Sequence, residues 1–113
     1  MAALTELLRQ RDERIQLLWD EARRLAAYFV SRGVASVWVF GSLAVGRAHS
    51  QSDLDLAVVW DTEVRPLERA LVLLDGLDPR VAVDLLVMTP RELELLDAGF
   101  LERAVRIDGL YGS

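Results

Sequence analysis

Three short apolar segments constrain the fold of this chain more than any other feature. They lie at residues 34–40, 54–60 and 81–88 and are rich in β-branched and aromatic residues. Segments of this length and composition are typical of buried β-strands. Helical patterns flank and separate them, in the order helix, strand, turn, strand, helix, strand, helix. This order predicts an α/β fold in which helices cover a small mixed β-sheet.

The longest predicted helix covers residues 4–32 and ends at Gly33, a residue that suits a helix terminus. Two seven-residue series form its apolar stripe: Leu4, Leu18 and Leu25, and Leu8, Ile15, Ala22 and Phe29. A helix of this length would be roughly 43 Å long, which is more than a small domain needs. The stripe therefore packs on the chain's own sheet or, in part, on another chain.

The connections between the strands give further predictions. Pro66 opens a helix that runs to about residue 74, and the capping box at residues 89–92 opens helical segments that continue, with a break near Gly99, to about residue 107. The thirteen residues between the first two strands have room for one short helical turn at 42–45. This link fits either a crossover or a wide hairpin, so the relative direction of the strands stays open.

Three aspartates lie in or next to the predicted strands. Asp53 and Asp55 point to one face at the start of the second strand, with Cα atoms about 6.5–7 Å apart. Asp84 interrupts the apolar third strand, where a carboxylate is costly unless it is paired or bound to metal, and neither strand contains a basic residue. If the two strands are neighbours, the three carboxylates form a cluster for which Mg²⁺ is the natural counter-charge. A D-x-D pair alone is more often a solvated strand entrance than a metal site.

A Gly-Ser turn follows the first strand. Gly41 allows the backbone to bend and a ligand to approach closely, and the following N–H groups and the Ser42 hydroxyl can hold phosphate oxygens. Gly46 allows the chain to turn back. A phosphate-binding turn beside a metal cluster suits the transfer of a nucleotide from a triphosphate.

These segments resemble the polymerase-beta-like nucleotidyltransferase superfamily, whose motif is h-G-S-x-A-x-G, then S-D-x-D-h, then h-x-D-h. Here GSLAVG at 41–46, SDLDL at 52–56 and VDL at 83–85 match it. The resemblance covers residues 34–88. The short length is similar to that of the minimal nucleotidyltransferases, the MNT proteins often paired with HEPN proteins in prokaryotic toxin–antitoxin modules.

The resemblance implies an ATP-type substrate and Mg²⁺, with two ions when ATP is bound. It implies that Asp53 and Asp55 hold the metals and that Asp84 completes the site nearest the acceptor hydroxyl. It implies that Gly41 and Ser42 bind the β- and γ-phosphates. Gly46 of the same motif and Arg47, the nearest basic residue where relatives often carry arginine at positions 43 or 45, are the other candidate nucleotide-binding residues. For the MNT group it implies AMP transfer to a tyrosine hydroxyl of a HEPN partner, which silences a ribonuclease toxin.

Three other functions remain open. The chain could be an antitoxin that neutralises its partner by contact alone, or a nucleotidyltransferase acting on a small molecule such as an aminoglycoside. It could also be an unrelated Mg²⁺ enzyme with a D-x-D motif. In phosphatases and glycosyltransferases of that kind the apolar strand precedes the acids, whereas here it follows them, which disfavours this last alternative.

Length and composition limit the domain organisation and the functions that this chain can have. At 113 residues we expect a single domain, with an N-terminal helix at 1–33, a catalytic core at 34–88 and a C-terminal helical segment at 89–113. Such a chain has no room for a further helical domain, so a homo- or hetero-oligomer is expected.

The net charge of −5 weighs against direct nucleic-acid binding. The absence of a signal pattern and of a long apolar run predicts a cytoplasmic protein that does not enter a membrane. The chain has neither cysteine nor lysine, which excludes disulfides, a Walker A motif and Schiff-base chemistry.

Overall fold

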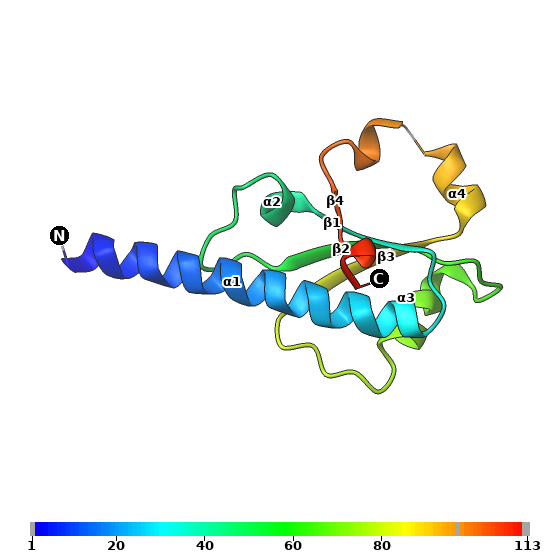
Figure 1. Cartoon of the computed structure of the whole chain (residues 1–113), viewed down its shortest axis with the longest axis horizontal. Coiled ribbons are helices and arrows are strands. Elements are labelled where there is room, and N and C mark those ends of the chain that lie inside the picture. Colours follow the sequence, from blue (N-terminus) through cyan, green and yellow to red (C-terminus); the bar gives the residue numbers. More distant parts are fainter. Residues whose placement is uncertain (1, 97, 112–113) are drawn as a thin grey trace.

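The computed structural model describes residues 2–96 and 98–111, and in them the predicted α/β fold is confirmed (Figure 1). Four strands form one sheet in the order β3-β2-β1-β4: β1 (Ser36–Phe40), β2 (Leu54–Val59), β3 (Val83–Met88) and β4 (Val105–Arg106). The helical elements are α1 (Ala2–Ser31), α2 (Gly41–Ala44), α3 (Pro66–Leu74), α4 (Pro90–Leu95), and the 3₁₀ turns η1 (Ala98–Leu101) and η2 (Asp108–Tyr111). Of these helices, none combines the length and apolarity needed to cross a bilayer.

The sheet is mixed. Strand β1 runs antiparallel to both β2 and β4, whereas β2 runs parallel to β3. The link between β1 and β2 is therefore a wide hairpin that contains α2, which decides between the two connections that the sequence left open. The β2–β3 connection carries α3, as parallel strands require a crossover.

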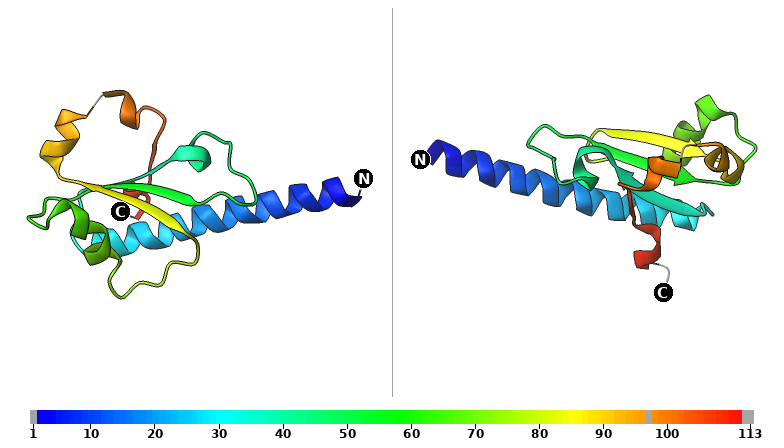
Figure 2. Two further views of the ribbon diagram at one scale, coloured as in Figure 1. Left: turned by 180° about the vertical axis from the view of Figure 1, so that it is seen from behind. Right: turned by 90° about the horizontal axis from the view of Figure 1, so that it is seen from above.

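The core lies between the C-terminal half of α1 and one face of the sheet. Its fully buried residues alternate along the strands and repeat along the helix: Val37, Val39, Leu54, Leu56 and Val58 meet Leu18, Ala22, Leu25, Ala26 and Phe29. Figure 2 shows α1 and the strands as separate layers, with the N-terminal half of α1 extending beyond the sheet. There Leu4, Leu7 and Leu8 are 57%, 59% and 42% exposed, so the predicted stripe is covered only in its C-terminal part.

Two predicted helix ends are confirmed. Gly33 follows α1 with a φ of 89°, in the left-handed region that glycine adopts without strain. The capping box at α4 is complete: the Glu92 N–H donates to the Thr89 hydroxyl at 3.2 Å, and the Thr89 N–H donates to the Glu92 carboxylate at 2.8 Å. The two reciprocal bonds satisfy N–H groups that would otherwise lack partners.

The prediction of helical segments from residue 89 holds for α4 and η1 but is wrong beyond Leu101, where it was expected to continue to about residue 107. The strand β4 lies at 105–106 and pairs with β1, where Trp38 faces Arg106 and Val39 faces Val105. The Ile107 N–H then donates to the Val37 carbonyl at 2.9 Å. An uncovered edge of β1 would leave backbone groups unpaired, and this demand outweighs the local helical pattern. Smaller differences concern boundaries: α1 begins two residues earlier than predicted, and β1 and β3 begin at Ser36 and Val83.

Glu21 is a buried acid on α1 that joins the helix to the loop before β3. Its carboxylate accepts hydrogen bonds from Arg24 Nε at 2.5 Å and Nη2 at 2.9 Å, and from the Arg80 N–H. The Arg24 bond, strengthened by the Arg80 contact, lowers the pKa of Glu21 despite its burial.

Replacing Glu21 with alanine is expected to lower the free energy of unfolding by about 2–3 kcal/mol, because the Arg80 N–H loses its acceptor and a charge-assisted bond is lost. Urea denaturation would measure this. The matched control is Asp20→Ala, which removes an ion pair with Arg23 on the same helix; the Asp20 side chain is 57% exposed. That control should change stability by less than about 0.5 kcal/mol, and equal losses in both variants would contradict the prediction.

Candidate active site

Asp55 and Asp84 lie side by side on neighbouring parallel strands. They are direct register partners of β2 and β3, and Asp55 also faces Phe40 of β1 across the antiparallel pair. Residues paired in this way point to the same face of the sheet. Since Leu54 and Leu56 point toward α1, these acids occupy the opposite face, which α1 does not cover.

Asp84 is exposed, which corrects the expectation that it lies within a buried strand. Strand β3 forms one edge of the sheet, and of its residues only Val87 and Met88 are buried. Residue 84 therefore retains contact with solvent, and the sequence pattern overstated the cost of its charge. One side of β3 contacts α3, which explains its apolar residues there. The other side is partly open to solvent.

Asp53 lies one residue before β2, and its side chain is 62% exposed. Its nearest cationic group comes from α1: Arg14 Nη2 lies 3.9 Å from Asp53 Oδ1. The sequence contains no local signal for this contact, because the two residues are far apart in the chain and Arg14 lies on a helix with several other arginines. Arg14 is thus a candidate site residue that sequence reasoning missed.

The three acids influence one another electrostatically. Burial raises the pKa of Asp55, and the neighbouring charges of Asp84 and then Asp53 raise it further. Within the described residues, Arg14 forms an ion pair with Asp53, and no basic side chain forms an ion pair with Asp55 or Asp84. Among residues 2–96 and 98–111, however, no three acidic, histidine or cysteine side chains already stand close enough to form a metal-binding group.

Gly41 brings the first turn of α2 against Asp55. Its φ is 70°, and a Cβ atom added to it would lie 2.1 Å from Asp55 Oδ2. Both the backbone angle and the lack of space therefore require glycine at this position. The result is that an acid of β2 and the chain turn after β1 are in direct contact, as the predicted juxtaposition of turn and acids requires.

The Ser42 hydroxyl is linked to the residue before Asp53. It lies 3.4 Å from the Ser52 hydroxyl, which in turn accepts a hydrogen bond from the His49 N–H at 2.8 Å. Ser52 is only 6% exposed. His49 itself is an exposed loop residue whose Nδ1 accepts from the Gln51 N–H at 3.1 Å, which makes it a loop-stabilising group.

Gly46 and Arg47 complete the turn but lie differently from Gly41. Gly46 has a φ of 74° with open space around it, and the Arg47 N–H closes the turn by donating to the Ser42 carbonyl at 2.8 Å. The Arg47 side chain is exposed and forms no ion pair within the described residues. The structure thus brings the Arg47 backbone to the turn but does not bring its guanidinium to the acids.

An aromatic pair borders the acid-bearing face. Phe40, the residue opposite Asp55, packs against Phe100 of η1 with ring centroids 5.9 Å apart. Phe100 was missed because the sequence pattern placed it in a helical segment without a defined partner. Its contact depends on the return of the chain from η1 to β4.

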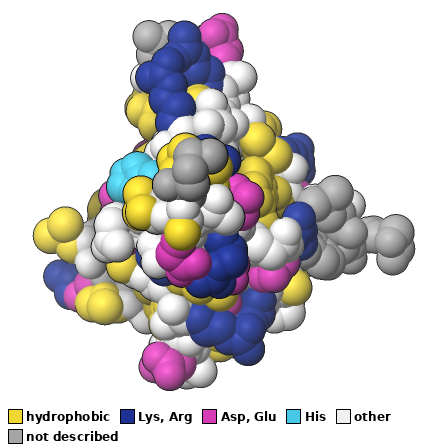
Figure 3. All heavy atoms as spheres, turned by 90° about the vertical axis from the view of Figure 1, so that its left-hand side faces the viewer, with side chains coloured by type: hydrophobic (Ala, Val, Ile, Leu, Met, Phe, Trp, Pro, Cys, Tyr) yellow, Lys and Arg dark blue, Asp and Glu magenta, His cyan; other side chains and the backbone are white. Residues whose placement is uncertain are grey.

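On the described surface seen from the projecting end of α1, basic and acidic side chains are mixed (Figure 3). Among them, Arg9 pairs with Glu6 and Glu13 on the helix itself. This distribution agrees with the net charge of −5 and does not resemble a phosphate-tracking surface.

Comparison with known proteins identifies the fold family. The family model described as polymerase beta nucleotidyltransferase matches residues 23–97, which include α2 and all three acids. A crystal structure from Sulfolobus solfataricus, of a protein provisionally described as a nucleotidyltransferase, is similar with a TM-score of 0.56 and 20% sequence identity, over 88% of this chain and 84% of that chain. No curated protein matches the chain. Since the family model covers well over half of the residues, the chain belongs to the polymerase beta nucleotidyltransferase family.

Proposed function

We propose that this chain is a Mg²⁺-dependent nucleotidyltransferase that moves a nucleoside monophosphate, AMP from ATP, onto a hydroxyl of a partner protein. The observation that carries the proposal is that Asp55 lies beside its register partner Asp84 and also closely approaches the Gly41 turn. The carboxylates that could bind a hard cation and the turn that could bind phosphates thus lie at the same end of the sheet. Family membership supports the reaction class.

The donor set fits the metal that the family uses. Carboxylate oxygens are the ligands that Mg²⁺ prefers. Burial raises the pKa of Asp55 most, the charges of Asp84 and Asp53 raise it further, and a divalent cation would offset those charges. Asp53, Asp55 and Asp84 would hold the ions. Because Asp53 is 62% exposed, its side chain is not fixed by packing.

In the proposed reaction, the acceptor oxygen forms a bond to the α-phosphorus, and the bond from that phosphorus to the pyrophosphate oxygen breaks. Mg²⁺ held by the three acids would offset negative charge on the phosphates and would acidify the acceptor hydroxyl. The chain contributes position: Gly41, which has no side chain, lets the phosphates approach the backbone, and the Ser42 hydroxyl and the Gly46–Arg47 turn border the same segment. The acceptor proton leaves toward Asp84, whose carboxylate is open to solvent.

The acceptor is proposed to come from a second macromolecule. The acid-bearing face is uncovered at β3, where Asp84 is exposed and Leu86 is 41% exposed. A second protein can therefore reach the acids without any rearrangement of the described core. The resemblance to minimal nucleotidyltransferases suggests a HEPN-type protein in this role.

The test is label transfer from α-³²P-ATP in the presence of Mg²⁺ and the protein encoded by the neighbouring gene. Label on that protein is expected with the native chain and is expected to disappear with Asp84→Asn. Asp84 is exposed, so this change should leave the fold intact. The control Asp61→Asn alters an exposed acid just after the opposite end of β2 and should transfer label normally.

A second candidate function is neutralisation of the partner by contact alone. It is favoured by the three exposed leucines at the projecting end of α1, which form an apolar surface outside the core. Complete neutralisation of the partner by Asp84→Asn, with no label transferred by the native chain, would support this candidate and overturn the enzymatic proposal.

A further inference from the structure

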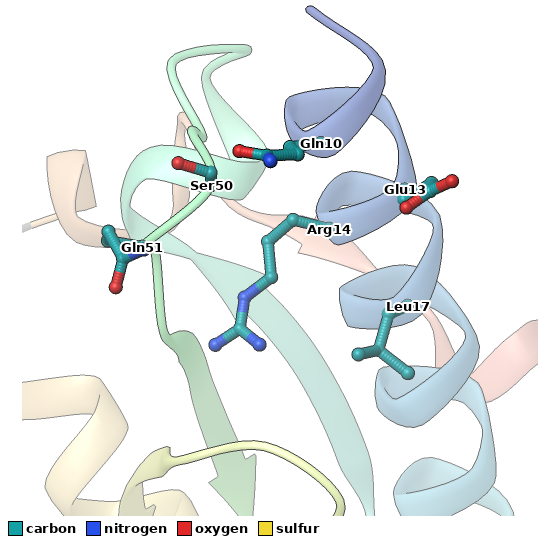
Figure 4. Close-up of a pocket in the computed structure, with 6 residues that line it drawn as sticks. All are labelled: Gln10, Glu13, Arg14, Leu17, Ser50 and Gln51. Carbon is teal, nitrogen blue, oxygen red and sulfur yellow. The ribbon is translucent and has the colours of Figure 1, made fainter. Parts of the chain in front are cut away.

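Arg14 connects the projecting helix to the candidate site. Counting from Ala2, it is the first residue of α1 that is not exposed. In Figure 4 its side chain points from α1 into the space between the helix and the strand β2. Its Nε donates to the Ser52 carbonyl at 2.9 Å, across 38 positions of sequence, and its Nη2 lies 3.9 Å from Asp53 Oδ1.

Ser52, whose carbonyl accepts the hydrogen bond from Arg14, is hydrogen-bonded to two other residues near the site. Its buried hydroxyl accepts hydrogen bonds from the His49 N–H and the Ser42 hydroxyl, and its own N–H donates to the His49 carbonyl at 3.0 Å. Asp53 follows it directly. A shift of Ser52 would therefore move the first carboxylate and the hydroxyl of the Gly-Ser turn together.

Packing alone does not fix this segment against α1. A cleft of about 340 Å³ separates them, lined by Gln10, Glu13, Arg14, Leu17, Ser50 and Gln51 (Figure 4). Polar side chains dominate this lining, so little apolar contact is available to hold residues 50 and 51 in place. The Arg14 side chain crosses from the helix to the segment and replaces such packing with a directed bond.

The contact with the carbonyl is the stronger of the two. A charge-assisted hydrogen bond at 2.9 Å in a partly buried position is worth more than an ion pair at 3.9 Å whose acid is 62% exposed and screened by solvent. We propose that Arg14 is a positioning residue of the nucleotidyl-transfer site, and that its Nε–H clamps the Ser52 carbonyl and thereby fixes Ser42 and Asp53 relative to each other. The role in transfer rests on the proposed function, whereas the clamp itself does not.

Two substitutions separate the clamp from the charge. In Arg14→Gln the side-chain nitrogen occupies the same place along the side chain as Arg Nε, so the bond to Ser52 can form without the positive charge. Arg14→Met has similar length but no donor. The variant Arg11→Met controls for loss of an arginine from α1, because Arg11 is exposed and, in the described part of the chain, its ion pair is with its neighbour Asp12.

The first measurement is amide hydrogen exchange in residues 49–53, which needs neither metal nor nucleotide. Exchange of the Ser52 and His49 amides is expected to rise about tenfold in Arg14→Met and to stay near the native rate in Arg14→Gln and Arg11→Met. Native protection in Arg14→Met would overturn the clamp. Equal loss in Arg14→Gln and Arg14→Met would also overturn it and assign the effect to charge.

The second measurement is binding of Mn²⁺-ATP, followed by the electron paramagnetic resonance of free Mn²⁺. We expect about tenfold weaker binding in Arg14→Met and near-native binding in Arg14→Gln, with melting temperatures recorded to show that each variant is folded. A loss of stability without a loss of affinity would reduce Arg14 to a structural residue and overturn its positioning role. If the native chain binds no Mn²⁺-ATP, the proposed function and the positioning role fail together, while the exchange result still decides the clamp.

Discussion

Replacing Asp55 with asparagine is expected to reduce nucleotidyl transfer by at least about a thousandfold, which corresponds to about 4 kcal/mol of activation free energy. Asp55 is the acid nearest both the Gly41 turn and Asp84, so its carboxylate is the central oxygen donor of the proposed metal site. Steady-state label transfer at saturating ATP would measure the loss. Mg²⁺ together with ATP should raise the melting temperature of the native chain and not of the variant.

The same substitution is expected to make the folded chain more stable at neutral pH. Burial and the charges of Asp84 and Asp53 raise the pKa of Asp55 above its ordinary value of 3.8, so the ionised form is disfavoured in the folded state. The penalty is fully present above the raised pKa, declines as the pH falls through it, and is absent below 3.8. The stability gain of Asp55→Asn should therefore vanish at low pH in urea denaturation experiments.

The combination of lost activity and gained stability distinguishes a site residue from a structural one. Asp61→Asn, an exposed acid after β2, should change neither quantity. An Asp55→Asn variant that transfers label at more than a tenth of the native rate would contradict the proposed role. A variant that loses both activity and stability would show instead that Asp55 supports the fold.

Replacing Gly41 with alanine is expected to lower the free energy of unfolding by about 3 kcal/mol and to abolish transfer. The left-handed backbone at a φ of 70° accounts for about 1–2 kcal/mol of this loss. The rest comes from the new Cβ, which would lie 2.1 Å from Asp55 Oδ2 and must displace that carboxylate. Thermal and urea denaturation, with label transfer, would measure both effects.

Gly33→Ala is the matched control for the cost of placing alanine in a left-handed backbone conformation. Gly33 has a φ of 89° but no atom within 4 Å of an added Cβ. It should lose only about 1–2 kcal/mol and retain transfer. Equal stability losses at both positions, with transfer retained in Gly41→Ala, would contradict the close approach of the turn and Asp55.

The features that depend on residues close together in the chain could be predicted from local sequence pattern. Periodicity and local composition located α1, β1, β2, β3 and α3, and the capping box located α4, because each element depends mainly on neighbours a few residues away. Alternation placed Asp53 and Asp55 on one face, and the motif spacing predicted which turn would lie beside them.

The features that depend on residues far apart in the chain could be seen only in the folded molecule. Strand β4 exists because the free edge of β1 required hydrogen-bond partners, and the exposure of Asp84 follows from the edge position of β3. The contact of Arg14 with Ser52 bridges 38 positions, and no local pattern can encode such a meeting. It arises because packing of the C-terminal half of α1 on the sheet fixes the direction in which the rest of the helix runs past the segment before β2.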